Sequence, residues 1–186
     1  SFGGGTESSN YRASIGVIDQ KGIIKDNYMR NYTAKLDASQ TMFNDKVKID
    51  FGMFGSKVDK RYLNDYQKTF YSAAAFNPTI PNFANEDGTW PEDPNANETL
   101  GRLTIKDQES SSYINANARI TWTVIDGLKL SAFGSYTYNV KENSRYFPNN
   151  IKANMGTNGR AEKEDNKSGV LLGNFTANYK KAFGKH

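Results

Sequence analysis

The chain has 186 residues, 37% hydrophobic and 24% charged, with a net charge of +4 and a mean hydropathy of −0.75. No apolar run approaches the ~18 residues of a membrane-spanning helix, which excludes a helical membrane protein but not a β-barrel, whose strands mix apolar and polar residues. The absence of Cys excludes disulfides and cysteine-ligated metals, and the mixing of basic with acidic residues argues against a nucleic-acid partner.

Alternating apolar and polar residues predict most of the chain to be β-strand. The opening, residues 1–9, is rich in Gly and Ser and predicts turns. Side chains alternate faces along a strand, so each alternating run has one apolar and one polar wall. The predicted strands cover residues 10–19, 27–43, 46–60, 110–125, 128–145 and 167–181.

The connections between these strands alternate in size. Asn44-Asp45 and Asp126-Gly127 predict tight turns, whereas residues 61–108 and 146–166 predict long loops. Strands of about 14 residues tilted near 45° rise about 33 Å, more than the ~25 Å apolar band of an outer-membrane barrel. Short turns on one side and long loops on the other are typical of such barrels.

The polar wall of the predicted sheet is ionic, which favours a barrel with a hydrated interior. Six charged residues are expected to line the lumen: Lys35, Asp37, Lys48, Asp50, Arg119 and Lys129. A soluble extracellular β-sandwich, acting as a carbohydrate-binding module, is the alternative, since its strands also alternate. Sandwich strands average about 5–6 residues, which disfavours it.

The first long loop carries candidate contact residues. Aromatic residues spaced three to four apart, from Tyr62 to Phe70, predict a short amphipathic helix ending before Pro78. Exposed aromatic rings stack on sugars or pack under a partner protein, and packing within the loop is the alternative. The candidates for contact with substrate or a lid protein are Trp90, Tyr62, Tyr66 and Phe83, with Trp90 preferred as an exposed contact.

No catalytic set is visible in the sequence. The single His is His186, so a Ser-His-Asp triad would lack its base. Asp93-x-Asn95-x-Asn97 resembles the start of a calcium loop, but Glu98 and Thr104 stand where an EF-hand has Gly and Glu. An irregular calcium site and a solvated acidic surface remain the two interpretations. We expect no enzyme activity, no cofactor and no resident metal.

Several motifs together resemble the SusC/RagA-type TonB-dependent transporters. The segments that carry the resemblance are Gly4–Glu7, Asn10–Ser14 and Asp19–Ile24 for the early barrel, Asn77–Pro81 and Asn85–Trp90 in the first long loop, and Tyr179–His186, which looks like a periplasmic turn. The resemblance covers the whole chain and is carried by the order of these pieces.

The resemblance implies a 22-stranded barrel with an N-terminal plug in the outer membrane of a Gram-negative bacterium, importing glycans or peptides. It implies four kinds of partner: a SusD-like lipoprotein lid, TonB acting through the plug, an oligosaccharide or peptide cargo, and membrane lipid with lipopolysaccharide. Six strands cannot close a transmembrane barrel, for which eight is the observed minimum. We therefore expect residues 1–186 to be a partial barrel whose plug and remaining strands lie elsewhere.

Overall fold

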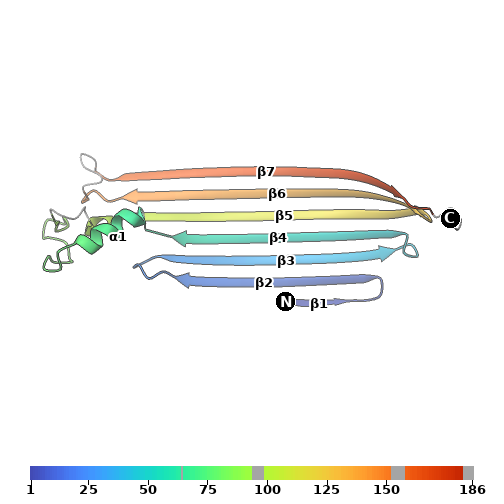
Figure 1. Ribbon diagram of the computed structural model, residues 1–186, viewed down its shortest axis with the longest axis horizontal. Coiled ribbons are helices and arrows are strands. Elements are labelled where there is room, and N and C mark those ends of the chain that lie inside the picture. The colour runs from blue at the N-terminus through green and yellow to red at the C-terminus, as the bar shows by residue number, and fades with distance from the viewer. Residues whose placement is uncertain (64, 94–98, 152–157, 182–186) are drawn as a thin grey trace.

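The computed structural model describes residues 1–63, 65–93, 99–151 and 158–181. These residues form one antiparallel sheet in which every strand pairs with its neighbours in chain order, with two short helices at one end (Figure 1). The strands are β1 (Phe2–Gly5), β2 (Ser9–Lys21), β3 (Tyr28–Met42), β4 (Val47–Arg61), β5 (Lys106–Ile125), β6 (Leu128–Phe147) and β7 (Arg160–Tyr179). The helices are α1 (Tyr66–Ala75) and α2 (Thr99–Leu103).

The strand register aligns the apolar residues of different strands on one face. One row of paired residues across six strands reads Ala13, Leu36, Met53, Ala116, Tyr136 and Leu171. The neighbouring row points the opposite way and reads Ser14, Lys35, Phe54, Asn115, Thr137 and Val170. We call these two surfaces the Leu36 face and the Lys35 face. Each strand therefore contributes to both faces with the period of two that strand geometry imposes.

The Leu36 face carries an apolar band of limited height. It begins at the tight-turn end with the row of Met42, Val47 and Trp122 and continues to the row of Tyr32 and Lys57. Ten residues of β3 separate Met42 from Tyr32, which is about 33 Å along the strand and about 23 Å of depth at a 45° tilt. This depth is close to the ~25 Å apolar band of outer-membrane barrels.

The band is exposed. Ile15, Leu171 and Phe175 are 79%, 81% and 68% exposed, although they are among the most apolar residues of their strands. In the described residues the strands form a single sheet, so no second sheet covers this face. A β-sandwich buries its apolar face against a second sheet, and the sandwich alternative is therefore wrong for the part of the chain that the structure describes.

Three expectations about strand boundaries need correction. The opening is a turn only from Thr6 to Ser9, because Phe2–Gly5 pair with Asn10–Ala13 as β1. The last three strands are 20 residues each, longer than predicted, and the predicted loop 146–166 is strand at both its ends, because β6 ends at Phe147 and β7 begins at Arg160. The extensions of β5 and β7, residues 106–109 and 160–166, are almost entirely polar on both faces, so they lack the apolar alternation that marks a strand in a sequence.

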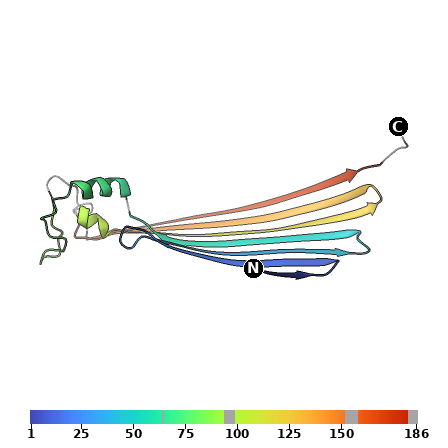
Figure 2. The same cartoon turned by 60° about the horizontal axis from the view of Figure 1, so that its bottom comes forward.

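Helix α1 confirms the predicted loop helix, and hydroxyl residues form its buried side. Thr69 and Ser72 are buried, and their hydroxyls donate to the carbonyls of Asp65 and Lys68 at 3.2 and 2.8 Å. Tyr66, one of the predicted contact candidates, and Phe70 are exposed. Figure 2 shows α1 beside the end of the long curved sheet, standing off its strands. Neither helix in the described ranges is long and apolar enough to cross a membrane.

Candidate functional site

All six residues predicted to line a lumen lie on the Lys35 face. Lys35 forms an ion pair with Asp37 at 3.0 Å, and Lys48 forms one with Asp50 at 2.8 Å. Asp50 is directly paired with Arg119 in the register, whereas Lys129 stands farther toward the tight-turn end, opposite Asn178. The register therefore brings five of the six into one region of the sheet. Whether that region encloses water in the complete protein stays a prediction.

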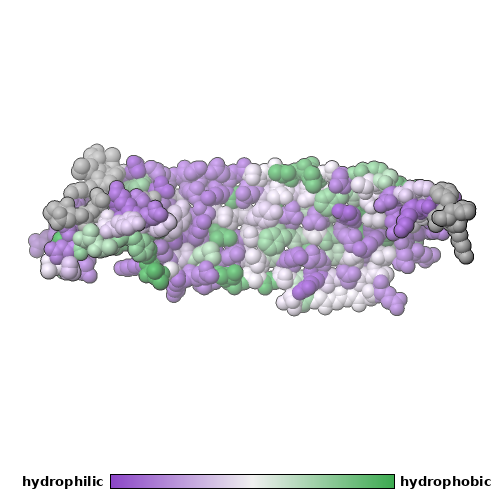
Figure 3. Space-filling model, in the orientation of Figure 1, coloured by the Kyte–Doolittle hydropathy of each residue, from purple (hydrophilic) through white to green (hydrophobic). Residues whose placement is uncertain are grey.

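A hydrogen-bonded set of amides and hydroxyls lies on the same face as these charges, and the sequence analysis missed it. The Asn115 amide donates to Ser135 Oγ at 3.2 Å and to Thr137 Oγ1 at 2.8 Å, and the Asn117 amide donates to Asn115 Oδ1 at 3.2 Å. Figure 3 views the sheet from the side on which α1 lies, and hydrophilic groups run the length of the strands. Such groups can exchange hydrogen bonds with water or with a polar solute passing over them.

At the long-loop end, the described residues between β4 and β5 (62–63, 65–93 and 99–105) cover the Lys35 face. Burial alternates along the start of β5, where Lys106 and Gln108 are exposed but Asp107 and Glu109 are 1% and 9% exposed. The buried positions point to the Lys35 face, so it is this face that the connection covers. Tyr62 fixes the start of the connection, because its backbone N–H donates to the Asp107 carbonyl at 3.2 Å.

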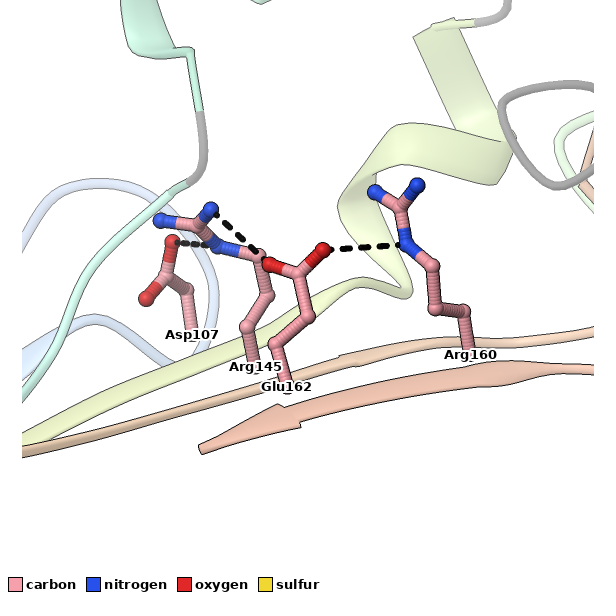
Figure 4. Close-up of polar contacts among 4 residues, drawn as sticks. All are labelled: Asp107, Arg145, Arg160 and Glu162. Carbon is pink, nitrogen blue, oxygen red and sulfur yellow. Dashed lines mark hydrogen bonds and ion pairs between the residues drawn. The ribbon is translucent and has the colours of Figure 1, made fainter. Parts of the chain in front are cut away.

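Charged side chains form a ladder across β5, β6 and β7 at this end of the sheet, with Asp107 buried and the others more exposed (Figure 4). Arg145 Nε donates to Asp107 at 2.9 Å, while its Nη1 contacts Glu162 at 3.5 Å. Glu162 also accepts from Arg160 Nε at 3.1 Å, and that guanidinium lies 4.3 Å from the Phe147 ring centroid. The guanidinium of Arg145 on β6 contacts one carboxylate on each neighbouring strand, Asp107 on β5 and Glu162 on β7. The ladder therefore holds the ends of all three strands together.

Glu109 forms a second ionic centre beside the ladder. Its carboxylate contacts Lys60 Nζ at 2.8 Å and Lys141 Nζ at 3.1 Å, joining β4, β5 and β6. Glu109 lies beyond the apolar band on the long-loop side. Burial raises the pKa of its carboxyl, but the hydrogen bonds and charges of the two lysines outweigh burial and hold the pKa below its usual range.

The loop core corrects the expectation for Trp90. Ile105, Phe147 and Ile151 form a buried apolar cluster, and Trp90 packs against it half-buried. The residue was expected as an exposed contact because Gly88 and Pro91 suggested a protruding turn. Its ring instead packs on the cluster, which is the alternative of packing within the loop.

The other three contact candidates occupy different settings. Tyr66 and Phe83 are 59% and 68% exposed. Tyr62 is half-buried, 5.8 Å from Lys60 Nζ measured to its ring centroid, and burial with the nearby charges of Asp107 and Glu109 raises the pKa of its phenol. Their contact with cargo or lid stays a prediction.

Helix α1 presents an exposed aromatic surface that includes Tyr66, one of the predicted contact candidates. Tyr66, Phe70 and Tyr71 are 59%, 49% and 79% exposed. Beside them lies a small apolar pocket of about 90 Å³, lined among others by Ile24 and Leu103. We call Tyr66, Phe70 and Tyr71 the α1 aromatic surface. The signal that could have revealed it is the pair of hydroxyl residues, Thr69 and Ser72, on the opposite side of the helix.

Metal ligands are not gathered in the described ranges, where no three His, Asp or Glu side chains lie together. Asp93 is 4% exposed and accepts the backbone N–H of Asn77 at 2.7 Å, so it helps to close the loop. The remainder of the suspected calcium loop, residues 94–98, lies outside the described residues, as does His186. The calcium site stays a prediction.

Comparison with known proteins shows which proteins this chain is similar to. No protein-family model matches the chain. TonB-dependent receptor SusC of Bacteroides thetaiotaomicron is 32% identical over 107 residues, which cover 54% of this chain and 10% of the relative. TonB-dependent receptor P3 of Formosa agariphila is 23% identical over 200 residues, which cover the whole chain and 20% of the relative.

A solved structure decides the fold. The RagAB peptide importer in its closed-closed state matches with a TM-score of 0.72 at 19% identity, covering 98% of this chain and 22% of that chain. The chain is similar to a segment of the SusC/RagA-type TonB-dependent transporters. Its sheet is a segment of an antiparallel β-barrel, and it spans only 10–20% of the length of the curated relatives.

Proposed function

We propose that the chain is part of an outer-membrane importer of glycans or peptides in a Gram-negative bacterium, powered by TonB and working with a SusD-like surface lipoprotein. The observation that carries this proposal is the division of the sheet into two faces. An exposed apolar band about 23 Å deep fits lipid, and the ionic Lys35 face fits a hydrated lumen.

The Lys35 face supports passage of a polar cargo. Its ion pairs at Lys35 and Lys48 and its amide network around Asn115 leave donors and acceptors available to a solute in water. Sugars and peptides both exchange hydrogen bonds with such groups, so either cargo class suits the surface. Lys35, Asp37, Lys48, Asp50, Arg119 and Lys129 are the proposed lumen residues.

The α1 aromatic surface supports docking of the lipoprotein lid. Three exposed rings on one loop helix are costly in water and typical of protein interfaces. The helix stands at the long-loop end, which faces the cell exterior in this arrangement (Figure 2). Tyr66 and Tyr71 are the residues we assign to the lid contact.

Transport rather than catalysis agrees with the relatives, which are named receptors and an importer. In this proposal TonB acts through a plug supplied by parts of the protein beyond this sheet, and the sheet needs no cofactor. The sheet contributes barrel wall, lumen lining and a lid-facing loop.

The test uses the complete protein in its native host. Outer membranes should retain it until detergent is added, and labelled oligosaccharide or peptide should enter cells only when both this protein and TonB are present. Recovery in the soluble fraction, or uptake that is unchanged when the protein is deleted, would contradict the proposal.

The lid contact has its own test. Tyr66→Ala with Tyr71→Ala should reduce recovery of the surface lipoprotein on affinity purification of the complete protein by at least about tenfold, since buried aromatic residues dominate interface energies. Phe43→Ala is the matched control, because Phe43 is 72% exposed but lies at the tight-turn end. Equal recovery from both variants would show that α1 does not contact the lid.

A further inference from the structure

We propose that the two long connections open and close as one body over the Lys35 face, and that a small seam between them is the latch. They are the β4–β5 connection and the β6–β7 connection, and of the latter the structure describes residues 148–151 and 158–159. The joint movement is inferred from contacts between the described residues. Its consequence for transport rests on the proposed function, because only then does the Lys35 face line a lumen.

The first support is an apolar contact between the two connections. Trp90 and Ile105 belong to the β4–β5 connection. They pack in one cluster with Ile151 of the β6–β7 connection and with Phe147 at the end of β6. Ile105 and Ile151 are only 2% and 4% exposed. We call this cluster the seam. One connection cannot move away from the other without exposing these side chains to water, which is unfavourable.

The second support is a hydrogen bond that crosses from one connection to the other. The Asn150 side-chain amide donates to the Gly88 carbonyl oxygen at 2.7 Å. Gly88 lies in a turn that Asn85 and Thr89 close through a backbone hydrogen bond at 2.8 Å, and its φ of 79° is one that favours glycine. The turn is therefore a defined part of the β4–β5 connection, and Asn150 ties the β6–β7 connection to it.

The third support is that the β4–β5 connection is folded on itself. Asp93 accepts the backbone N–H of Asn77 at 2.7 Å, and α1 packs against α2. Figure 2 shows the two helices at the end of the sheet, with α1 standing off the strands. The connection leaves the sheet at Tyr62, whose backbone N–H donates to the Asp107 carbonyl at 3.2 Å. A segment held by its own contacts in this way opens as a cooperative unit.

The fourth support is that the seam is small and imperfectly satisfied. Trp90 Nε1 and Asn150 Oδ1 are buried, and neither has a hydrogen-bond partner among the described residues. A buried polar atom without a partner destabilises the closed arrangement, and opening would expose it to water. Four apolar side chains also bury much less surface than the core of a domain. The closed state is therefore favoured by a small margin, as a latch requires.

Opening would uncover charged groups at the long-loop end of the Lys35 face. Asp107 and Glu109 are 1% and 9% exposed, and they form ion pairs with Arg145 at 2.9 Å and Lys141 at 3.1 Å. These groups lie beyond the apolar band, at the mouth of the lumen in the proposed function. The latch therefore controls whether a polar solute reaches this part of the wall.

Hydrogen exchange of the complete protein in nanodiscs tests the joint movement. The latch variant, Asn150→Ala with Ile151→Ala, changes only the β6–β7 connection. It should speed exchange at least about tenfold at the Tyr62 amide, which lies outside the seam, because truncating a buried Ile weakens its cluster by more than that factor. Asn150→Ala alone should act in the same direction. Asn149→Ala is the matched control, because Asn149 is exposed and adjacent.

The control should exchange like wild type, and amides 114–122 of β5 should be unchanged in all variants, which shows that the sheet stays folded. Faster exchange confined to the seam would overturn the joint movement. Equal exchange at Tyr62 in the latch variant and the control would overturn it as well.

A cross-link tests the consequence for transport. In a cysteine-free background, Thr89→Cys with Asn149→Cys places thiols beside the Gly88–Asn150 hydrogen bond, where a short bismaleimide can join them. The joined protein should lose uptake of labelled oligosaccharide or peptide, whereas a maleimide with one reactive end should leave uptake unchanged. Equal uptake by the joined and unjoined proteins would overturn the latch. Absence of uptake by wild type would instead contradict the proposed function, and hydrogen exchange would still decide the joint movement.

Discussion

Placing a charge in the middle of the apolar band tests which face meets lipid. Ala116 is on the Leu36 face, in the row between Met53 and Tyr136. Along β5 it is four residues from Ser112, in the row of Tyr32 and Lys57 where the band ends, and six from Trp122 at the other edge of the band. These separations correspond to about 9 Å and 14 Å of depth at a 45° tilt, so Ala116 lies near the midplane.

Ala116→Arg should therefore lower the free energy of unfolding by about 2–4 kcal/mol, the cost of Arg near the bilayer midplane. The same change at Ser112, at the long-loop edge of the band, should cost about 0–1 kcal/mol because the charge lies near the interface. Asn117→Arg, one residue away on the Lys35 face, should be mild because its row neighbours are Gly52 and Ser135.

The assay is guanidinium unfolding of the complete protein refolded in lipid vesicles, with all three variants compared at one lipid ratio. The reasoning requires that Ala116→Arg leaves a free energy of unfolding far below those of Ser112→Arg and Asn117→Arg. Equal losses from Ala116→Arg and Asn117→Arg would refute the facing, and a large loss from Ser112→Arg alone would refute the depth.

Two further predictions concern the strand ends. The folded-state pKa of Glu109 lies below its unfolded value, so its ion pairs stabilise the fold above the unfolded pKa and that stabilisation is lost as pH falls through the folded pKa. The free energy of unfolding of wild type should exceed that of Glu109→Gln by about 1–3 kcal/mol at pH 7. This difference should shrink below about pH 4, and a difference that stays constant down to pH 3 would contradict the prediction. Gly127 has φ of 89°, and an added Cβ would meet the Lys180 carbonyl oxygen, so Gly127→Ala should cost at least about 1 kcal/mol. Gly134, with open space around it, is the matched control: Gly134→Ala should be near neutral in the same assay, and equal losses at both sites would contradict the steric reason.

The alternation of residues made much of the sheet predictable. Six of the strands have counterparts in the sequence prediction, because the period of two persists wherever one wall is apolar. The turn at Asn44-Asp45 was also readable: both residues have positive φ, which Asn and Asp tolerate better than most residues. Turn position then fixed the register of β3 against β4.

Prediction failed where apolar contrast was missing. Residues 106–109 and 160–166 continue the strands with polar side chains on both faces, held by ion pairs between strands that a single sequence does not reveal. Phe2–Gly5 form β1 because they pair with the backbone of β2. The three glycines of this segment have no side chains, so no alternation is visible in the sequence. In each of these segments, pairing with another strand makes the residues part of the sheet, and a local sequence pattern does not reveal that pairing.

The same reason explains which site residues were predicted correctly and which were not. The charges at Lys35 and Asp50 were assigned to their face correctly, because alternation determines facing. Trp90 was misplaced because its environment comes from Ile105 and Phe147, which are distant in sequence. Of the α1 aromatic surface, only Tyr66 was among the predicted contacts, because aromatic residues at helical spacing usually mark a core, whereas this helix buries two hydroxyl residues.

The most direct measurement of the central claim is spin-label accessibility along β5 in the complete protein, reconstituted in lipid. Labels placed one at a time at positions 113–122, in a cysteine-free background, report contact with lipid through oxygen and contact with water through a nickel chelate. We predict that positions 114, 116, 118, 120 and 122 respond to oxygen and the odd positions to nickel. Accessibility without a period of two, or even positions shielded from both reagents, would contradict the account.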